Sequence, residues 1–346
     1  MKRLVPILAT VVLAGCVCNK AATPCNCAQP PVPPCDKKMP PPPPCCPDPV
    51  MGNWSAKLPY DDMFAGSFIF SRDEKGAPKA FVLWRWGSPE WVTDLKVEGN
   101  RFSFTHPYGL RYEGCVQGDR MIARLAEFDT RNGKFTSAWK PFYGVRNPAI
   151  CDKVRTEDAK LGEPIDLLKD GLDGWKLMSA TAKNGWSFKD GVLSNKLGLK
   201  ADGSWAGGGA NLMTRRADFF DFNLEYDVRV PAKSNSGVYL RGRFECQVVD
   251  SFGKPVDRHN MAAYYGRVAP SQAVDKKPGE WQHVSVTLYK GHITTWLNGV
   301  KIIDNAKLEG VTGGAIDADL NAAGPIYLQG DHSDADFKNM ILRPAL

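Results

Sequence analysis

The chain lacks a second long apolar run. After Leu13, no segment approaches the ~20 consecutive apolar residues that a membrane-spanning helix needs. It also lacks a convincing pattern for a long helix. Its basic residues are dispersed among acidic ones, and the formal charge of +6 falls to about +4 without Lys2 and Arg3. These absences argue against a membrane-spanning body and against a nucleic-acid partner.

What is present is ordinary globular composition, with 43% hydrophobic and 24% charged residues in a chain of 346. This length is enough for two domains with sizeable cores.

The N-terminus carries an export signal. Lys2 and Arg3 precede an apolar run from Leu4 to Leu13, and Leu13-Ala14-Gly15-Cys16 follows. This pattern resembles a bacterial lipoprotein signal over residues 1–16, with Cys16 as the lipidated, mature N-terminus. The alternative is an ordinary signal peptide with a chance cysteine. We expect a soluble body tethered to a membrane by lipid, on the periplasmic side or surface of the outer membrane. The outer membrane is favoured because Val17, rather than an aspartate, follows the lipidated position.

Residues 17–50 are rich in cysteine and proline and cannot form a core, so we predict an extended, disordered spacer. No histidine and no CxxC pair lies there, which favours disulfides over a zinc site for its cysteines. Further along, Cys115 and Cys151 are a candidate disulfide, and Cys246 is predicted to be an inert core thiol.

Two β-rich regions follow the spacer. Residues 51–155 alternate between short apolar strands and turns such as EGNR and QGDR, which predicts a small antiparallel β-barrel or meander. Residues 156–162 are polar and are predicted to be a linker. Residues 163–346 contain many short alternating strands with Gly and Asn at the turns, which predicts a two-sheet sandwich or jelly roll.

The most informative stretch is NSGVYLRGRFECQVVDS, residues 235–251. Read as one alternating strand, it places apolar side chains such as Val238 and Cys246 on one face. The other face carries Tyr239, Arg241, Arg243, Glu245 and Gln247. Because buried charge is costly unless it is paired, this row predicts a wet, concave sheet that holds a polyhydroxylated ligand.

Several motifs of the second region resemble the 3-keto-disaccharide hydrolase domain family. They are LLKDGLDGWKL, WSFKDGVLS, FNLEYDVRV, the stretch at residues 235–251, KPGEWQHVSVTL and GPIYLQGD, in the same order throughout. The resemblance covers about residues 163–346. It implies a concanavalin-like jelly roll, and therefore an all-β chain, that acts on keto-sugar glycosides. The sequence departs from the family at Cys246 and in the order of the QGDH segment that ends at His332.

A ketone at C3 of a sugar acidifies the C2 hydrogen, so a base can remove it and the C1 glycosidic oxygen can leave before water adds back. We assign Glu245 as the base, Arg241 or Arg243 as the group that stabilises the enolate, and Asp250 as a second carboxylate. The acid for the leaving group is His332 or His259.

The remaining candidates are substrate-binding residues: Gln247, Tyr265 and Gln329 for hydroxyl groups, together with Asp331. Each candidate also has a structural explanation: Glu245 and Arg243 as an ion pair on a solvated face, Asp250 as a turn residue. A divalent metal ion held by Asp250, Asp331 and His332 could stabilise the enolate in place of the arginine, although the spacing of these residues does not require a metal.

We therefore expect a lipid-anchored envelope protein that hydrolyses 3-keto-glycosides or 3-keto-disaccharides by elimination and hydration. Two alternatives are a non-catalytic carbohydrate-binding surface lipoprotein and an envelope structural protein. A catalytic site should show a carboxylate with a raised pKa, whereas a lectin should show an aromatic platform.

Overall fold

The computed structural model describes residues 48–61, 64–92 and 94–346, all of which belong to one compact unit, Lys38–Leu346. The predicted signal at residues 1–16, with Cys16, and nearly all of the spacer lie outside the described residues. The described chain is almost entirely β-structure, with two 3-10 turns, η1 (Thr156–Asp158) and η2 (Gly171–Gly174), and no α-helix. No helix in these ranges is long and apolar enough to cross a membrane.

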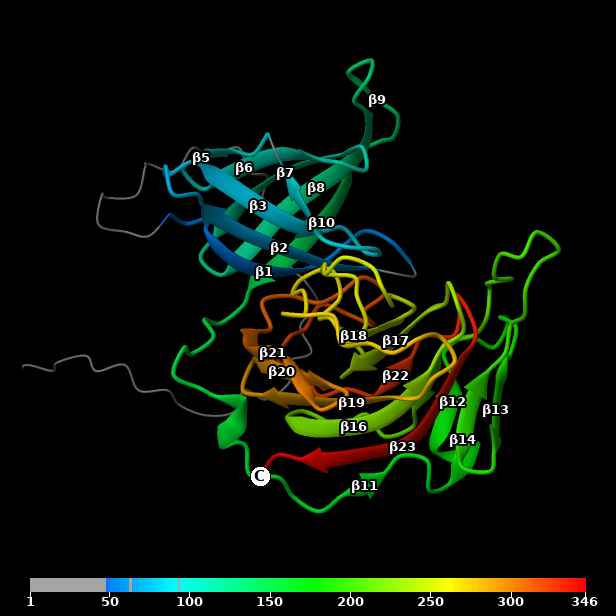
Figure 1. The fold of residues 1–346 in the computed structure, drawn as a ribbon. Coiled ribbons are helices and arrows are strands. Elements are labelled where there is room, and N and C mark those ends of the chain that lie inside the picture. The colour runs from blue at the N-terminus through cyan, green and yellow to red at the C-terminus, as the bar shows by residue number, and fades with distance from the viewer. Residues whose placement is uncertain (1–47, 62–63, 93) are drawn as a thin grey trace, which may run out of the picture. The chain divides into compact units, whose positions relative to one another are not determined.

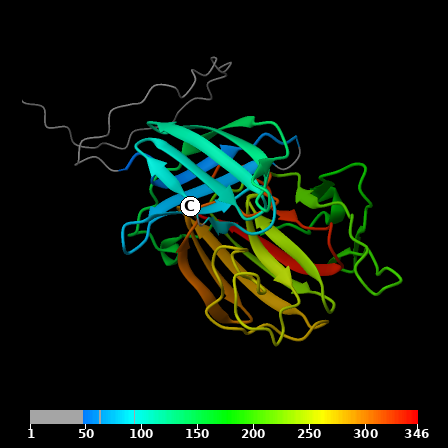
Figure 2. The same ribbon diagram turned by 90° about the horizontal axis from the view of Figure 1, so that it is seen from above.

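The first region forms one antiparallel sheet. Its strands are β1 (Gly52–Lys57), β2 (Ala65–Arg72), β3 (Pro78–Leu83), β4 (Glu90–Val92), β5 (Lys96–Glu98), β6 (Arg101–His106), β7 (Leu110–Gln117), β8 (Arg120–Asp129), β9 (Lys134–Phe135) and β10 (Lys140–Arg146). They are ordered β4-β3-β2-β1-β10-β8-β7-β6-β5, with β9 added to β8. Figure 2 shows these strands side by side in blue and cyan. β4 also contacts β6, so the sheet curls over its own core.

Both hairpin turns predicted in this sheet are confirmed. Gly99 connects β5 to β6 and Gly118 connects β7 to β8, each with φ near +60°. Glycine adopts this backbone conformation without a steric penalty. The alternating apolar residues of the sheet form a core that includes Trp54, Phe68 and Tyr112.

The second region forms two sheets. The larger contains β11 (Ile165–Asp166), β13 (Trp186–Lys189), β14 (Val192–Asn195), β16 (Phe222–Arg229), β19 (Gln282–Tyr289), β20 (His292–Leu297), β21 (Val300–Lys307) and β23 (Ala335–Pro344). The smaller contains β12 (Trp175–Leu177), β15 (Leu212–Thr214), β17 (Asn235–Leu240), β18 (Phe244–Val249) and β22 (Tyr327–Leu328).

The two sheets pack as a sandwich. Figure 1 shows β17, β18 and β22 lying over β16, β19 and β23. One apolar cluster is shared by both layers, with Leu224, Val286 and Phe337 from the larger sheet and Val238 and Val248 from the smaller. The curled antiparallel sheets confirm the predicted all-β class with a jelly-roll-like sandwich.

The stretch at residues 235–251 is a hairpin rather than the single strand predicted. β17 and β18 pair antiparallel with Tyr239 opposite Glu245 and Gly237 opposite Gln247. Arg241 and Gly242 have φ of +54° and +67°, and Arg243 N–H donates to the Leu240 carbonyl at 3.1 Å. Two consecutive residues with positive φ make the tight turn that suits a twisted hairpin. The dipeptide Arg-Gly was the turn signal.

The hairpin preserves the predicted division into two faces because three residues, 241–243, separate Leu240 from its partner Phe244, so even-numbered residues of both strands share one face. Val238, Leu240, Phe244, Cys246 and Val248 all lie in the core cluster. Cys246 is a buried free thiol, as predicted, and burial raises its pKa to about 12.

The predicted disulfide near the junction between the regions is wrong. Cys115 is disulfide-bonded but not to Cys151, which is a free, exposed thiol. Residues 156–162, the predicted linker, lie between β10 and β11, and Thr156 at their start is buried, with its hydroxyl bonded to that of Thr294 at 2.5 Å.

Val238→Asp should unfold the sandwich, because it places an unpaired charge where the side chain is fully buried, at a cost of about 3 kcal/mol or more. Val145→Asp is the matched control, since Val145 is 57% exposed on β10. Chemical denaturation of both variants measures the difference. Equal loss of stability in the two would contradict the assigned faces.

Candidate functional site

Glu245 is the centre of the candidate site. It lies on β18 with 3% of its surface exposed, and its backbone N–H donates to the Thr312 hydroxyl at 3.1 Å. Gly237, on the neighbouring strand, leaves room for the carboxylate: a Cβ there would lie 2.3 Å from Glu245 Oε1. The glycine of the SGVYL motif therefore has a steric reason at this position.

The environment of Glu245 favours its protonated form. Burial, with a smaller contribution from the charge of Asp331, raises the pKa of Glu245 to about 8, and a hydrogen bond with Tyr239 opposes part of the shift. A carboxylate with this pKa is a stronger base than an exposed one and can exchange a proton near neutral pH.

Two tyrosines lie next to this carboxylate. The rings of Tyr239 and Tyr327 stack with their centroids 4.0 Å apart and 12° between their planes. The Tyr239 hydroxyl donates to the Gly313 carbonyl at 2.7 Å. Burial raises the pKa of both tyrosines well above the usual value, and the Glu245 charge adds to the shift. Both hydroxyls therefore remain protonated, and the single proton of Tyr239 is used in its bond to Gly313.

The two arginines do not line an open groove. The Arg243 guanidinium binds both oxygens of Asp317 at 2.6 Å. Its remaining contacts are with the backbone carbonyls of Arg241, Ala322 and Ala323. Arg241 donates to the Leu320 carbonyl at 2.7 Å and lies over the rings of Phe220 and Phe244. Both side chains bind the protein itself.

The prediction of a wet polar face is wrong for the same reason. Tyr239, Arg241, Arg243, Glu245 and Gln247 are all buried. The loop from Val311 to Gly324 covers the row, with Thr312 N–H donating to the Arg243 carbonyl and Ile316 N–H to the Gly242 carbonyl, each at 3.0 Å. The Arg243 charge is tolerated because Asp317 of the loop pairs it, and Arg241 is bound by the Leu320 carbonyl of the same loop.

Asp331, His332 and Gln329 extend the site from β22. His332 Nδ1 lies 2.5 Å from Asp331 Oδ1, and this hydrogen bond raises the pKa of His332. Gln329 N–H pairs with the Gly237 carbonyl at 2.9 Å, next to the carboxylate of Glu245. The Gln329 side-chain oxygen is buried and has no hydrogen-bond partner among the described residues.

Asp250 and Gln247 are used structurally. Asp250 accepts the Lys233 N–H at 2.8 Å, and the Gln247 side-chain oxygen accepts the Val248 N–H at 2.9 Å. Among the described residues, no three His, Cys, Asp or Glu side chains gather. The proposed metal ligands Asp250, Asp331 and His332 therefore do not come together.

Tyr265 and His259 lie on another side of Glu245. Tyr265 N–H donates to the Glu245 carbonyl at 3.0 Å. The ring centroids of Tyr265 and His259 are 5.4 Å apart. His259 Nε2 lies 2.6 Å from the Ser88 hydroxyl, which comes from the first sheet. Burial raises the pKa of Tyr265, and the Glu245 charge contributes.

Sequence reasoning missed Tyr327, Thr312 and Ser88. Tyr327 lies two residues before Gln329 in the motif YLQGD. Residues two apart on a strand share a face, so the choice of Gln329 could have indicated Tyr327 as well. Thr312 and Ser88 had no such signal, because they reach the site through contacts distant in sequence.

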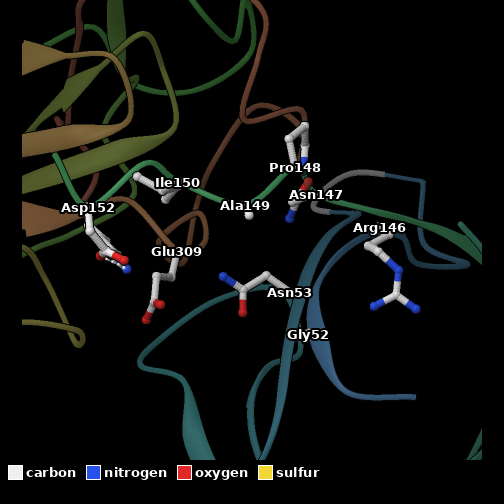
Figure 3. A pocket seen from close by; sticks show the side chains of 10 residues that line it. Gly52, Asn53, Arg146, Asn147, Pro148, Ala149, Ile150, Asp152 and Glu309 are labelled. Atoms are coloured by element: carbon white, nitrogen blue, oxygen red, sulfur yellow. Dashed lines mark ion pairs between the residues drawn. The ribbon is translucent and has the colours of Figure 1, made fainter. Parts of the chain in front are cut away.

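A separate cavity of about 390 Å³ contains none of these residues. It is lined by Gly52, Asn53, Arg146, Asn147, Pro148, Ala149, Ile150, Asp152, Lys307 and Glu309. Figure 3 shows Asp152 and Glu309 on one side of the view and Arg146 on the other. We assign it no chemistry.

The comparison with protein families places this sandwich in the class of carbohydrate-active, glycosyl hydrolase-like domains. Residues 164–343, just over half of the 346 residues, match the 3-keto-alpha-glucoside-1,2-lyase-like domain. The chain belongs to this family. The resemblance inferred from its motifs is confirmed.

Solved structures with a similar fold include a provisionally named glycosyl hydrolase from Parabacteroides distasonis. It is 23% identical, with a TM-score of 0.41, and the match covers 53% of this chain and all of that one. The carbohydrate binding module CBM66 from Bacillus subtilis is 14% identical, with a TM-score of 0.31, covering 48% and 93%. Scores this low carry no argument about function. No curated protein shows a significant match.

The raised pKa of Glu245 predicts a specific pH dependence of stability. The folded protein keeps a proton that the unfolded chain releases above pH 4.5, so the contribution of Glu245 to stability is full below 4.5 and declines as pH rises to about 8. Glu245→Gln cannot titrate and should gain several kcal/mol relative to the wild type between about pH 4 and about pH 9. Denaturant unfolding of the variant and the wild type at both pH values measures the difference in their free energies of unfolding. Parallel behaviour of the two proteins would show that Glu245 titrates normally.

Proposed function

We propose that this protein hydrolyses 3-keto-glycosides, including 3-keto-disaccharides, by elimination of the glycosidic oxygen followed by addition of water. The observation that supports it best is the buried Glu245, with a pKa near 8 in a domain of the 3-keto-alpha-glucoside-1,2-lyase-like family.

Glu245 is the proposed base. The C3 ketone acidifies the hydrogen on C2, and the ionised carboxylate takes this proton while the electron pair moves onto the ketone oxygen as an enolate. The enolate then expels the oxygen on C1, which breaks the glycosidic bond and leaves a double bond between C1 and C2. Water adds across this bond, returning a hydrogen to C2 and placing a hydroxyl on C1.

His332 is the proposed acid. Its hydrogen bond to Asp331 raises its pKa, so a larger share of it is protonated at neutral pH. A protonated imidazole can give its proton to the departing oxygen. The base and the acid thus have their pKa values set by different surroundings, burial for Glu245 and a carboxylate partner for His332.

The enolate oxygen needs a hydrogen-bond donor. Arg241 and Arg243 were the candidates from the sequence, and both guanidiniums bind other parts of the protein. We assign this role to the hydroxyl of Tyr327, which lies beside Glu245 and stays protonated, because the single proton of the Tyr239 hydroxyl is donated to the Gly313 carbonyl. The Gln329 side-chain oxygen, which has no partner in the described part of the chain, is proposed to accept a substrate hydroxyl.

A non-catalytic carbohydrate-binding protein is the second candidate. The specific observation in its favour is the exposed aromatic surface of Trp86 and Tyr108 on the first region. The buried basic carboxylate favours the enzyme, because a lectin has no need for a group that costs stability when it ionises.

We further propose that the protein acts at the cell envelope, tethered by lipid on Cys16. The support is the sequence Leu13-Ala14-Gly15-Cys16 after a short apolar run.

Glu245→Gln should lower turnover of 3-keto-trehalose by roughly 10²–10⁴-fold, because the amide keeps the shape of the side chain but cannot take the proton. Glu225→Gln is the control, since Glu225 forms a partly exposed pair with Arg343 on the larger sheet. Turnover is measured by release of glucose, with unoxidised trehalose alongside. A wild-type rate for Glu245→Gln would exclude this base, and equal activity on trehalose would exclude the mechanism.

Cys16→Ser should leave the protein folded and active but release it from the membrane fraction or change its location, because one thioether-linked lipid site is lost. Fractionation of cells that express each form measures this. A variant that stays with the membrane like the wild type would argue against the anchor.

A further inference from the structure

The first region contributes residues to the surroundings of Glu245 through the segment Trp84–Glu90. Ser88 bonds His259 at 2.6 Å, and Glu90 accepts from the Arg258 guanidinium at 3.2 Å. The Arg85 carbonyl accepts the Gly314 N–H at 3.1 Å. Since Gly313, the residue before Gly314, accepts the Tyr239 hydroxyl and Tyr239 contacts Glu245, three hydrogen bonds connect the segment to the carboxylate of Glu245.

Glycines in the second region make this approach possible. A Cβ on Gly313 would lie 2.3 Å from the Gly87 carbonyl oxygen, and a Cβ on Gly266 would lie 2.9 Å from the Ser88 hydroxyl. Both contacts are closer than a side chain permits. The two regions therefore fit together at the site without space for larger residues.

Two exposed aromatic side chains lie near each other in the first region, Trp86 in this segment and Tyr108 in the turn between β6 and β7. Trp86 is 41% exposed and Tyr108 is 55% exposed. A Cβ on Gly87, the residue after Trp86, would lie 3.8 Å from the Tyr108 hydroxyl, so the two are neighbours. The hydroxyl of Tyr265 is within electrostatic reach of both Tyr108 and Glu245. Exposed aromatic surface beside a polar site is typical of a ligand-binding surface.

Trp86 is held in place before any ligand arrives. The Arg85 guanidinium lies 3.7 Å from the centre of the Trp86 ring and 4.0 Å from that of Tyr60. Trp84 contacts both Trp86 and Tyr108, with ring centres 4.8 and 5.8 Å away. A ring fixed by such contacts loses little conformational entropy when a ligand packs on it.

We infer that Trp86 and Tyr108 form a second sugar subsite, which binds the part of a disaccharide or longer glycan beyond the ring that reacts at Glu245. The C–H face of a pyranose packs against an aromatic ring, whose electron-rich face attracts polarised C–H groups. Because Glu245 is buried and the two aromatics are exposed, the reacting ring lies inward and the leaving sugar outward. This inference deepens the proposed function and rests on it for the identity of the reacting ring.

The test compares 3-keto-trehalose, which has a sugar as leaving group, with methyl 3-keto-α-glucoside, which does not. Trp86→Ala and Tyr108→Ala should each lower kcat/KM for 3-keto-trehalose about 10-fold relative to the methyl glycoside, one decade being an ordinary value for one lost packing contact. Trp296→Ala is the matched control, because Trp296 is also 41% exposed but lies on β20. It should leave the ratio unchanged.

A second measurement separates the subsite from the proposed reaction. Calorimetric titration with unoxidised trehalose and cellotriose should show weaker binding by Trp86→Ala than by the wild type and Trp296→Ala. If the wild type turns over neither keto-glycoside but this difference persists, the proposed function fails and the subsite stands. Unchanged kinetic ratios in both aromatic variants would overturn the subsite. So would the absence of glycan binding in a wild type that also lacks turnover.

Discussion

The candidate site depends on one interaction, the buried ion pair between the Arg243 guanidinium and Asp317. Arg243 is the last residue of the β17–β18 turn, and its guanidinium binds Asp317 and the carbonyls of Ala322 and Ala323. These contacts fix the loop from Val311 to Gly324, and that loop covers Glu245 through Thr312. A charge buried and paired in this way costs desolvation, so its contribution is to specify one arrangement of the loop rather than to add much stability.

Covering Glu245 also determines its chemistry. An exposed carboxylate near Asp331 would remain a weak base, whereas exclusion of water raises the pKa of Glu245 to about 8. The polar row is therefore divided by function. Arg241 and Arg243 build the enclosure, Glu245 can exchange a proton, and Tyr327, stacked on Tyr239, can donate one.

Much of the fold follows from local patterns in the sequence. Alternation predicts the two faces of the hairpin, and Gly99 and Gly118 mark turns that the structure contains. Glu245 could be selected because a carboxylate in an alternating row is conspicuous. The ion pair between Arg243 and Asp317 could not be predicted. The partners are 74 residues apart, and alternation contains no information about which loop covers a sheet. Ser88 escaped for the same reason, because its partner lies 171 residues away.

The contacts of the first region also bear on where the family domain can be separated from the rest of the chain. Ala65 and Leu83, both from the first sheet, belong to the apolar cluster of the sandwich. A protein truncated to residues 164–343 would expose the apolar surface of the sandwich that Ala65 and Leu83 cover. It would also lose the Arg85 carbonyl, which accepts the Gly314 N–H. The boundary of sequence similarity thus cuts through packed contacts, and we expect the truncated domain to be less stable than the full chain.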